Sequence, residues 1–341
     1  NICYQPAGLA PIRDNYDGLL PVPGDGRYEW QDYYDMDLLP VEENPDRGWV
    51  ATANAMSLPP DYPYKARKLG FEWANPWRID RISEVLEGTN RHSMQDSIDL
   101  QRDYLSIPAR RILDALNIND LPVPAAGLFA DWDFRLTRDS GAAALFEIWW
   151  SRHFKDAVMQ RILDIQDITN LGEPDGLVVV ESFEAMDEAQ RQLIAGESLQ
   201  DALATAAELM GQNIADWSWG GLHKMKFRHP LLDFVDGETR ALLAIPEVSR
   251  GGSGDTPNST RYARDFSVVS GASWRMVLDV GNWDNAFMTN APGQSGDPRS
   301  PHYDDLLDNW ASDGKLPLVY SREAVERNAD ERIILIPARR E

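Results

Sequence analysis

The sequence has little cysteine and little histidine. Cys3 is the one cysteine among 341 residues, so no internal disulfide can form. His223 and His229, two of the 5 histidines, are near each other in the chain but match no metal-binding spacing. These absences predict neither a disulfide framework nor a structural metal site.

Basic residues and long apolar runs are also scarce. The 33 Lys and Arg residues stand against 55 Asp and Glu residues, which gives a formal net charge of -22. A field of this sign repels nucleic-acid backbones and anionic membrane surfaces. Apolar runs such as 142–146 and 177–180 are far shorter than the roughly 20 residues that cross a bilayer. We therefore predict no nucleic-acid partner and no membrane partner.

The composition and the first residue limit what kind of chain this is. With 43% apolar residues, the chain can bury a large core, either as one large domain or as two medium ones. It begins with Asn1 rather than methionine. We expect from this a trimmed chain, a proteolytic product or one chain of a processed precursor.

Hydrophobic periodicity divides the sequence into three stretches. Residues 1–87 contain short strand-like pieces and are predicted to be β-rich, whereas residues 88–215 have a helical period. Residues 216–341 return to alternation with short helices between. This order predicts an α+β fold.

Several elements are predicted within these stretches. Ser93 and Asp96 form a capping-box pattern that opens a helix, and 177–180 is compatible with a strand or a helix. The longest apolar period, over 143–165, predicts a central helix. Further helices are predicted at 109–116, 185–195, 198–211, 302–311 and 321–328. A hairpin is predicted from 265–269 and 273–280 around Gly271, a third strand at 286–289 and a final buried strand at 333–336.

The stretch 48–88 has features of a functional site. The apolar segment 49–53 predicts a strand, and Asn54 follows where that strand ends. An asparagine there can present its side-chain NH2 to a group outside the sheet. Residues 78–87 predict a short amphipathic helix, and Arg78 lies in its first turn, where the helix dipole disfavours a cation.

Short motifs spread along the chain form a set in their order and spacing. In the first part they are Asn1-Ile2-Cys3-Tyr4, Leu20-Pro21-Val22-Pro23-Gly24 with Tyr28-Glu29-Trp30, Asn44-Pro45 with Gly48-Trp49-Val50-Ala51-Thr52-Ala53-Asn54, and Arg78-Ile79. Later ones are Gly271-Ala272-Ser273-Trp274-Arg275-Met276-Val277, Pro292-Gly293-Gln294-Ser295-Gly296 and Ser300-Pro301-His302-Tyr303-Asp304-Asp305. Together they resemble the β chain of the penicillin acylase family, from the first residues to about Val325.

The resemblance implies an N-terminal-nucleophile hydrolase with an αββα sandwich core, interrupted here by a large helical insertion. Members of that family are made as a precursor that cuts itself into an α chain and a β chain. The β chain begins with the catalytic serine, whose α-amino group is its base. Penicillins, cephalosporins, acyl-homoserine lactones and other small amides are implied substrates, and a periplasmic or secreted location is implied as well.

Three residues match site positions of the family. The resemblance assigns Asn54 to the oxyanion hole, and a neutral NH2 donor suits that role because it does not titrate. It assigns Arg78 to the orientation of the nucleophile's surroundings, and it places Phe71 near the acyl pocket. Without the resemblance, Asn54 would be a turn residue and Arg78 a surface partner of Asp80 or Glu84.

Two departures from the family shape the prediction. Position 1 holds no Ser, Thr or Cys, and 1–4 matches an interior strand of the family's β chain. We therefore expect the C-terminal part of a β subunit, inactive alone, with the rest of the β chain and an α chain as partners. Many members bind calcium, partly through an acid in the region that matches Lys65-Ala66-Arg67, which is basic here, so no cofactor is predicted.

Two other functional classes stay open. The first is a non-catalytic binding or scaffold protein of the same fold that has no nucleophile. The second is a glycosidase, which would need two acids roughly 5 to 10 Å apart in one cleft.

Overall fold

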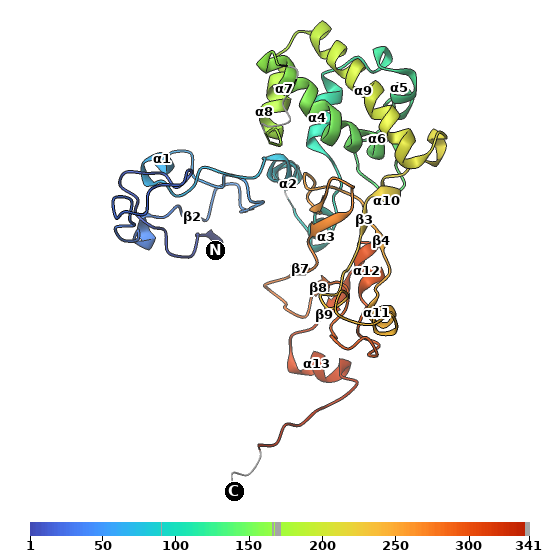
Figure 1. Cartoon of the computed structure of the whole chain (residues 1–341). Coiled ribbons are helices and arrows are strands. Elements are labelled where there is room, and N and C mark those ends of the chain that lie inside the picture. Colours follow the sequence, from blue (N-terminus) through green and yellow to red (C-terminus); the bar gives the residue numbers. More distant parts are fainter. Residues whose placement is uncertain (90, 166, 168–171, 338–341) are drawn as a thin grey trace.

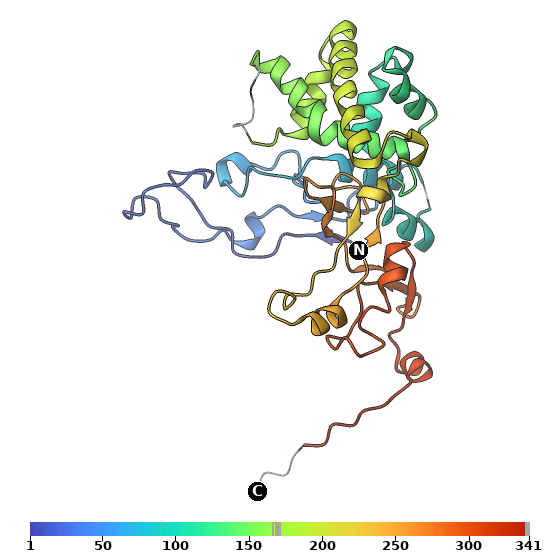
Figure 2. The ribbon, with the colours of Figure 1, turned by 45° about the vertical axis from the view of Figure 1, so that its right-hand side comes forward.

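The computed structural model describes residues 1–89, 91–165, 167 and 172–337. Figure 1 shows an N-terminal arm at one side, a helical body, a β-containing body next to it and an extended C-terminal tail. The arm and the tail leave the two bodies in different directions in Figure 2 as well.

The N-terminal arm has little regular structure. Its strands β1 (Cys3–Tyr4) and β2 (Glu42–Glu43) pair antiparallel, and its helices are the 3-10 turn η1 (Met36–Leu38) and α1 (Tyr64–Arg67). The prediction of a β-rich stretch over 1–87 is therefore wrong, and so is the strand at 49–53. In the described part of the chain no segment pairs with 49–53, and a strand needs a neighbour to satisfy its backbone groups.

Of the helices from α2 to α10, all but α3 form the helical body, whereas α3 packs against the β-containing body. In chain order, these helices with α3 included are α2 (Trp77–Glu87), α3 (Met94–Leu100), α4 (Ile107–Asp114), η2 (Ile118–Asp120), α5 (Val123–Phe129), α6 (Gly141–Trp149), the π-helical turn η3 (Trp150–Phe154), α7 (Lys155–Leu163), α8 (Gly176–Glu184), α9 (Glu188–Met210), η4 (Ile214–Asp216) and α10 (Trp219–Leu222). The capping box of Ser93 and Asp96 is confirmed at the start of α3.

Helix α6 is the centre of this body, as the sequence predicts. Ser140 caps its N-terminus, and every residue from 142 to 149 is buried. Phe154 in η3 packs edge-on against Trp149 and Phe183, with ring centroids 4.7 and 4.9 Å apart. The apolar run therefore serves as the hub on which α5, α8 and α9 pack.

Three helix predictions need correction. The two helices predicted at 185–195 and 198–211 are one helix, α9, of 23 residues. Ser198 lies buried inside it, where its hydroxyl donates to the Ile194 carbonyl oxygen at 2.6 Å instead of capping a new helix. The segment 177–180, which the sequence left open between a strand and a helix, is helical and belongs to α8. The helix predicted at 109–116 begins earlier because Pro108 sits in its first turn, which tolerates proline.

The β-containing body has two small sheets. In the first, the order is β4 (Val248–Ser249), β3 (Lys224–Met225), β6 (Val268–Gly271) and β5 (Thr260–Tyr262). In the second, the order is β7 (Arg275–Leu278), β8 (Ala286–Thr289) and β9 (Leu316–Leu318). The strand predicted at 286–289 is confirmed. The hairpin around Gly271 is wrong, because β6 pairs with β5 whereas β7 pairs with β8 in the other sheet.

Short helices complete this body. They are α11 (Gly237–Leu243), α12 (Leu307–Ala311) and α13 (Arg322–Asn328). Ser321 caps α13, which confirms that prediction. The helix predicted at 302–311 starts only at Leu307, because 300–305 forms turns. The final strand predicted at 333–336 is absent, and its side chains are exposed.

A buried ionic cluster joins α12 to the sheets. The guanidinium groups of Arg250 and Arg275 both donate to Asp313 Oδ1, at 2.8 and 2.6 Å. Arg250 also donates to the carbonyl oxygens of Trp310 and Ala311, at 2.6 and 2.7 Å. The carbonyl end of α12 thus carries part of the negative charge that faces two buried cations.

A second polar pair joins α6 to β5 and makes the stability of the fold depend on pH. Glu147 is 1% exposed, and Tyr262 donates a hydrogen bond to its Oε2 at 2.6 Å. Burial raises the pKa of Glu147 to about 8, although the Tyr262 hydrogen bond and Lys155 act in the opposite direction. The folded protein therefore holds this proton up to a higher pH than the unfolded chain does.

We predict the effect of Glu147→Gln from this difference. Because the folded pKa is above the unfolded one, Glu147 stabilises the fold most at low pH, and the contribution is lost as pH rises from about 4.5 to about 8. Through Glu147, the free energy of unfolding changes by at most about 1.4 kcal/mol per pH unit. Glutamine keeps an acceptor for Tyr262 and does not titrate.

Urea unfolding at pH 5 and pH 8 should show a smaller pH dependence for Glu147→Gln than for wild type. The exposed control Glu29→Gln should keep the wild-type dependence, and an unchanged dependence in Glu147→Gln would contradict the assignment.

Candidate active site

Asn54 is held at a sharp bend of the backbone. Its φ is 62°, in the left-handed region that asparagine tolerates better than most residues. Its neighbours Ala53 and Ala55 are buried, whereas Asn54 itself is exposed. The Ala74 N–H donates to the Asn54 carbonyl oxygen at 3.0 Å, which ties this bend to the segment before α2. The bend therefore fixes the backbone and turns the side chain outward.

Arg78 fixes the orientation of the Asn54 amide. Its Nη2 donates to Asn54 Oδ1 at 3.0 Å. A guanidinium can only donate, so it contacts the amide oxygen and leaves the NH2 group of Asn54 pointing elsewhere. The structure thus brings together two residues that are 24 positions apart in sequence. The result is a neutral NH2 donor whose orientation a cation fixes, and preorganised donors of this kind can stabilise an oxyanion.

The first turn of α2 is anchored from both sides. Trp77 is fully buried, and the Leu177 N–H at the start of α8 donates to Asn75 Oδ1 at 3.2 Å. Partial burial lowers the pKa of Arg78, and the negative charge of Asp255 opposes this shift. The negative charge of Asp255 therefore favours a cation at Arg78, in the first turn of α2, where the helix dipole disfavours one.

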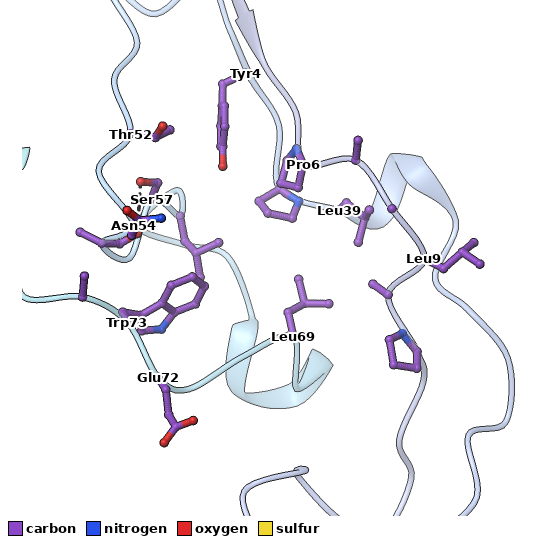
Figure 3. A pocket seen from close by; sticks show the side chains of 18 residues that line it. Tyr4, Pro6, Leu9, Leu39, Thr52, Asn54, Ser57, Leu69, Glu72 and Trp73 are labelled. Atoms are coloured by element: carbon purple, nitrogen blue, oxygen red, sulfur yellow. Dashed lines mark hydrogen bonds between the residues drawn. The ribbon is translucent and has the colours of Figure 1, made fainter. Parts of the chain in front are cut away.

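An open cavity of about 730 Å³ lies beside Asn54. Figure 3 shows Asn54 and Ser57 close together on one wall, Trp73 below them, and Leu69 and Leu39 toward the opposite wall. The other lining side chains are mostly apolar, with Tyr4, Thr52 and Glu72 as further polar ones, and polar atoms make up nearly half of the surface that faces the cavity. Such a cavity suits an apolar group attached to a polar centre near Asn54.

Phe71 does not line this cavity. Its ring packs against Tyr64, with centroids 6.2 Å apart, and it is not among the residues that line the cavity. The structure therefore brings Asn54 and Arg78 together but leaves Phe71 aside. Sequence reasoning missed Trp73, and the one signal that could have found it is its place between Phe71 and Arg78.

The Ser57 hydroxyl in this cavity is not activated. Ser57 Oγ donates to the Ala55 carbonyl oxygen at 3.3 Å, so its proton goes to a backbone acceptor rather than to a base. An enzymatic serine nucleophile needs a basic partner within hydrogen-bond reach. Across the residues that the structure describes, this site has an amide NH2 group with a fixed orientation but no serine paired with a base.

Nothing in the described ranges offers a metal centre. Among these residues no group of three His, Cys, Asp or Glu side chains could hold an ion. The region of Lys65 and Arg67 is occupied by cation–π contacts with Tyr64 and Tyr62. As far as the chain is described, none of its helices combines the length and the apolar character needed to cross a membrane.

Comparisons with known proteins agree on one family. A sequence model of the family described as penicillin amidase matches residues 1–327. Penicillin acylase 2 proenzyme of Pseudomonas sp. (strain SE83) is 31% identical, over 96% of this chain and 44% of that protein. Acyl-homoserine lactone acylase QuiP of Pseudomonas putida is 27% identical, over 99% of this chain and 46% of that protein. The chain thus spans less than half the length of these curated relatives.

A solved structure supports the fold. The thermostable penicillin G acylase from Alcaligenes faecalis superposes with a TM-score of 0.61 at 19% identity, over 99% of this chain and 66% of that chain. The match confirms the predicted fold class, an α+β part of an N-terminal-nucleophile hydrolase fold.

Proposed function

The chain belongs to the penicillin amidase family, and from this we propose that it is part of an amidohydrolase that cleaves the amide of an acylated small molecule. The observation that carries the proposal is the Arg78 contact with Asn54 Oδ1 at 3.0 Å, which leaves the Asn54 NH2 group available as a donor. The apolar side chains of the cavity beside it support an acyl group as the part of the substrate that is bound there.

In the proposed reaction, a serine oxygen bonds to the amide carbonyl carbon, and the carbonyl electron pair moves onto its oxygen. Asn54 donates to that oxyanion. The carbon–nitrogen bond then breaks, and the amine leaves with the proton taken from the serine. Water next attacks the acyl-enzyme ester, releases the acid and returns the proton to the serine. Arg78 contributes by holding the Asn54 amide throughout.

We assign the serine to a part of the enzyme outside residues 1–341. The support is that this chain spans 44% and 46% of the relatives above and that Ser57 is paired with a backbone oxygen. The same proposal makes this chain the C-terminal part of a β subunit, cut from a precursor. The rest of the β chain and an α chain would be its partners in a periplasmic or secreted heterodimer, and the chain alone would be inactive.

The substrate class follows the names of the relatives. One is named a penicillin acylase and another an acyl-homoserine lactone acylase. We propose an acylated β-lactam, an acyl-homoserine lactone or a similar amide for this enzyme. An apolar acyl group on such an amide would fit the leucine and proline side chains of the cavity wall.

The experiment that tests this function uses the enzyme purified from its native host. Intact mass and N-terminal sequencing would identify its chains, and release of free amine from penicillin G and from an acyl-homoserine lactone would be measured. We expect a longer β chain that begins with serine, and hydrolysis of at least one of these amides. A native protein that binds the amides without releasing amine would instead favour the scaffold alternative.

We predict that the acyl group contacts Trp73 more closely than Phe71. Trp73 is 40% exposed and lines the cavity, so Trp73→Ala removes apolar surface from the wall. KM for an acylated substrate should rise about 10-fold, with kcat little changed. Phe71, which the family resemblance places near the acyl pocket, is the matched aromatic control. An effect of Phe71→Ala larger than that of Trp73→Ala would reverse this assignment and favour the resemblance.

A further inference from the structure

The tail segment 333–336 is apolar and lies in water. Ile333, Ile334, Leu335 and Ile336 are 80%, 74%, 90% and 83% exposed. Figures 1 and 2 both show the tail leaving α13 and running away from the body in an extended course. Exposed apolar area costs about 25 cal/mol per Å² relative to burial. Four large apolar side chains in a row therefore indicate a segment that another surface covers.

The pattern of the segment indicates what kind of surface this is. Side chains alternate along a strand, so Ile333 and Leu335 would point to one face of a sheet and Ile334 and Ile336 to the other. An apolar residue at every position is typical of a strand whose two faces are both covered. The branched side chain of isoleucine also favours a strand over a helix. The segment thus fits the interior of a sandwich rather than an edge that faces water.

The chain's own sheets offer poor acceptors. In the described residues, β9 is three residues long and contains Pro317, which has no N–H to donate. At the other edge of that sheet, Gln101 Nε2 already donates to the Met276 carbonyl oxygen of β7 at 2.8 Å. The edge strands β4 and β5 are two and three residues long. None of these edges offers four consecutive residues whose backbone N–H and C=O groups are all free to pair.

We propose that 333–336 inserts as a strand into a sheet formed by the part of the same enzyme outside residues 1–341. The superposed penicillin G acylase chain has about a third of its length outside the match, since this chain covers 66% of it. The inference rests on the proposed function only in taking the enzyme to be longer than this chain. It names the docking element and does not require amide hydrolysis.

Hydrogen exchange of the native enzyme tests the proposal. Amides of 333–336 should exchange about 100-fold or more slowly than those of an unstructured peptide of the same sequence. Exchange at the peptide rate would overturn the proposal. Protection that appears only as protein concentration rises, together with a doubled mass in light scattering, would assign the acceptor to a second copy of the chain and would overturn it as well.

A pair of variants separates docking from solubility. Ile334→Asp combined with Ile336→Asp places charge on one buried face of the proposed strand and should release the tail to rapid exchange. Val280→Asp is the matched control, since Val280 is 79% exposed at a turn after β7. It should leave tail protection unchanged. Equal protection in the double variant and in wild type would overturn the proposal, whether or not the enzyme hydrolyses any amide.

Discussion

Replacing Asn54 by alanine is expected to lower kcat of the assembled enzyme by about 100- to 1000-fold and to change KM little. The oxyanion exists only in the transition state and the tetrahedral intermediate, so losing its donor affects the chemical step more than substrate binding. The Arg78 contact at 3.0 Å orients the amide, and this orientation is what gives the donor its effect.

The controls for this prediction use the orienting arginine and a distant asparagine. Arg78→Lys keeps the charge but loses the fork of donors, so kcat should fall, though less than in Asn54→Ala. Asn15→Ala removes an asparagine whose Nδ2 donates to the Arg27 carbonyl oxygen in the N-terminal arm. Steady-state hydrolysis should be unchanged in that control. An Asn54→Ala enzyme with wild-type kcat would show that Asn54 is not an oxyanion donor.

Asp313→Asn is expected to destabilise the fold by about 3 to 5 kcal/mol. Asp313 accepts hydrogen bonds from Arg250 and Arg275, whose side chains are 1% and 8% exposed. Asparagine is close in size but neutral, so two guanidinium groups would stay buried without a carboxylate. Only neutral oxygens, the asparagine Oδ1 and the carbonyl oxygens at the end of α12, would then face both cations.

Urea unfolding followed by fluorescence measures this effect. Asp297→Asn is the matched control, because Asp297 pairs with Arg299 at 2.8 Å on the surface, where an ion pair contributes little. Its unfolding midpoint should stay at the wild-type value. If Asp313→Asn also unfolds at the wild-type midpoint, the carbonyl oxygens of Trp310 and Ala311 are sufficient for both cations, and the account of the cluster is wrong.

Local signals in the sequence predict the helices well. The capping box at Ser93 and the apolar period of α6 depend on residues within a few positions, and both are confirmed. The break predicted within α9 fails because Gly196 and Ser198 are local helix-breaking signals, which burial and the bond to Ile194 override. Predictions of helix boundaries thus fail where tertiary packing outweighs the local conformational preference of the residues.

Strands are harder to predict because their partners lie far away in sequence. The segments 49–53 and 333–336 have strand-like composition but no partner in the described chain. The segments around Gly271 have hairpin-like composition, yet they enter two sheets, because β7 finds β8 and β6 finds β5. An alternating pattern predicts which side chains lie on each face of a strand, but it does not identify the strand that pairs with it.

The candidate site could be predicted only in part. Composition and spacing make Asn54 a residue at the end of a segment, and the family resemblance gives it a role. Its contact with Arg78 depends on the bend at φ 62° and on the anchoring of α2, neither of which is encoded in a motif. Trp73 was missed because a turn decides which of two nearby aromatic side chains faces the cavity.

We propose that this chain supplies the oxyanion donor, Asn54, to a serine outside residues 1–341. Labelling the native, active enzyme with phenylmethylsulfonyl fluoride and mapping the modified peptide tests it most directly. We expect the labelled enzyme to lose hydrolysis and to carry one sulfonylated serine, at the N-terminus of a segment outside these residues. A label on Ser57, or on any other serine of residues 1–341, with the same loss of hydrolysis would contradict it.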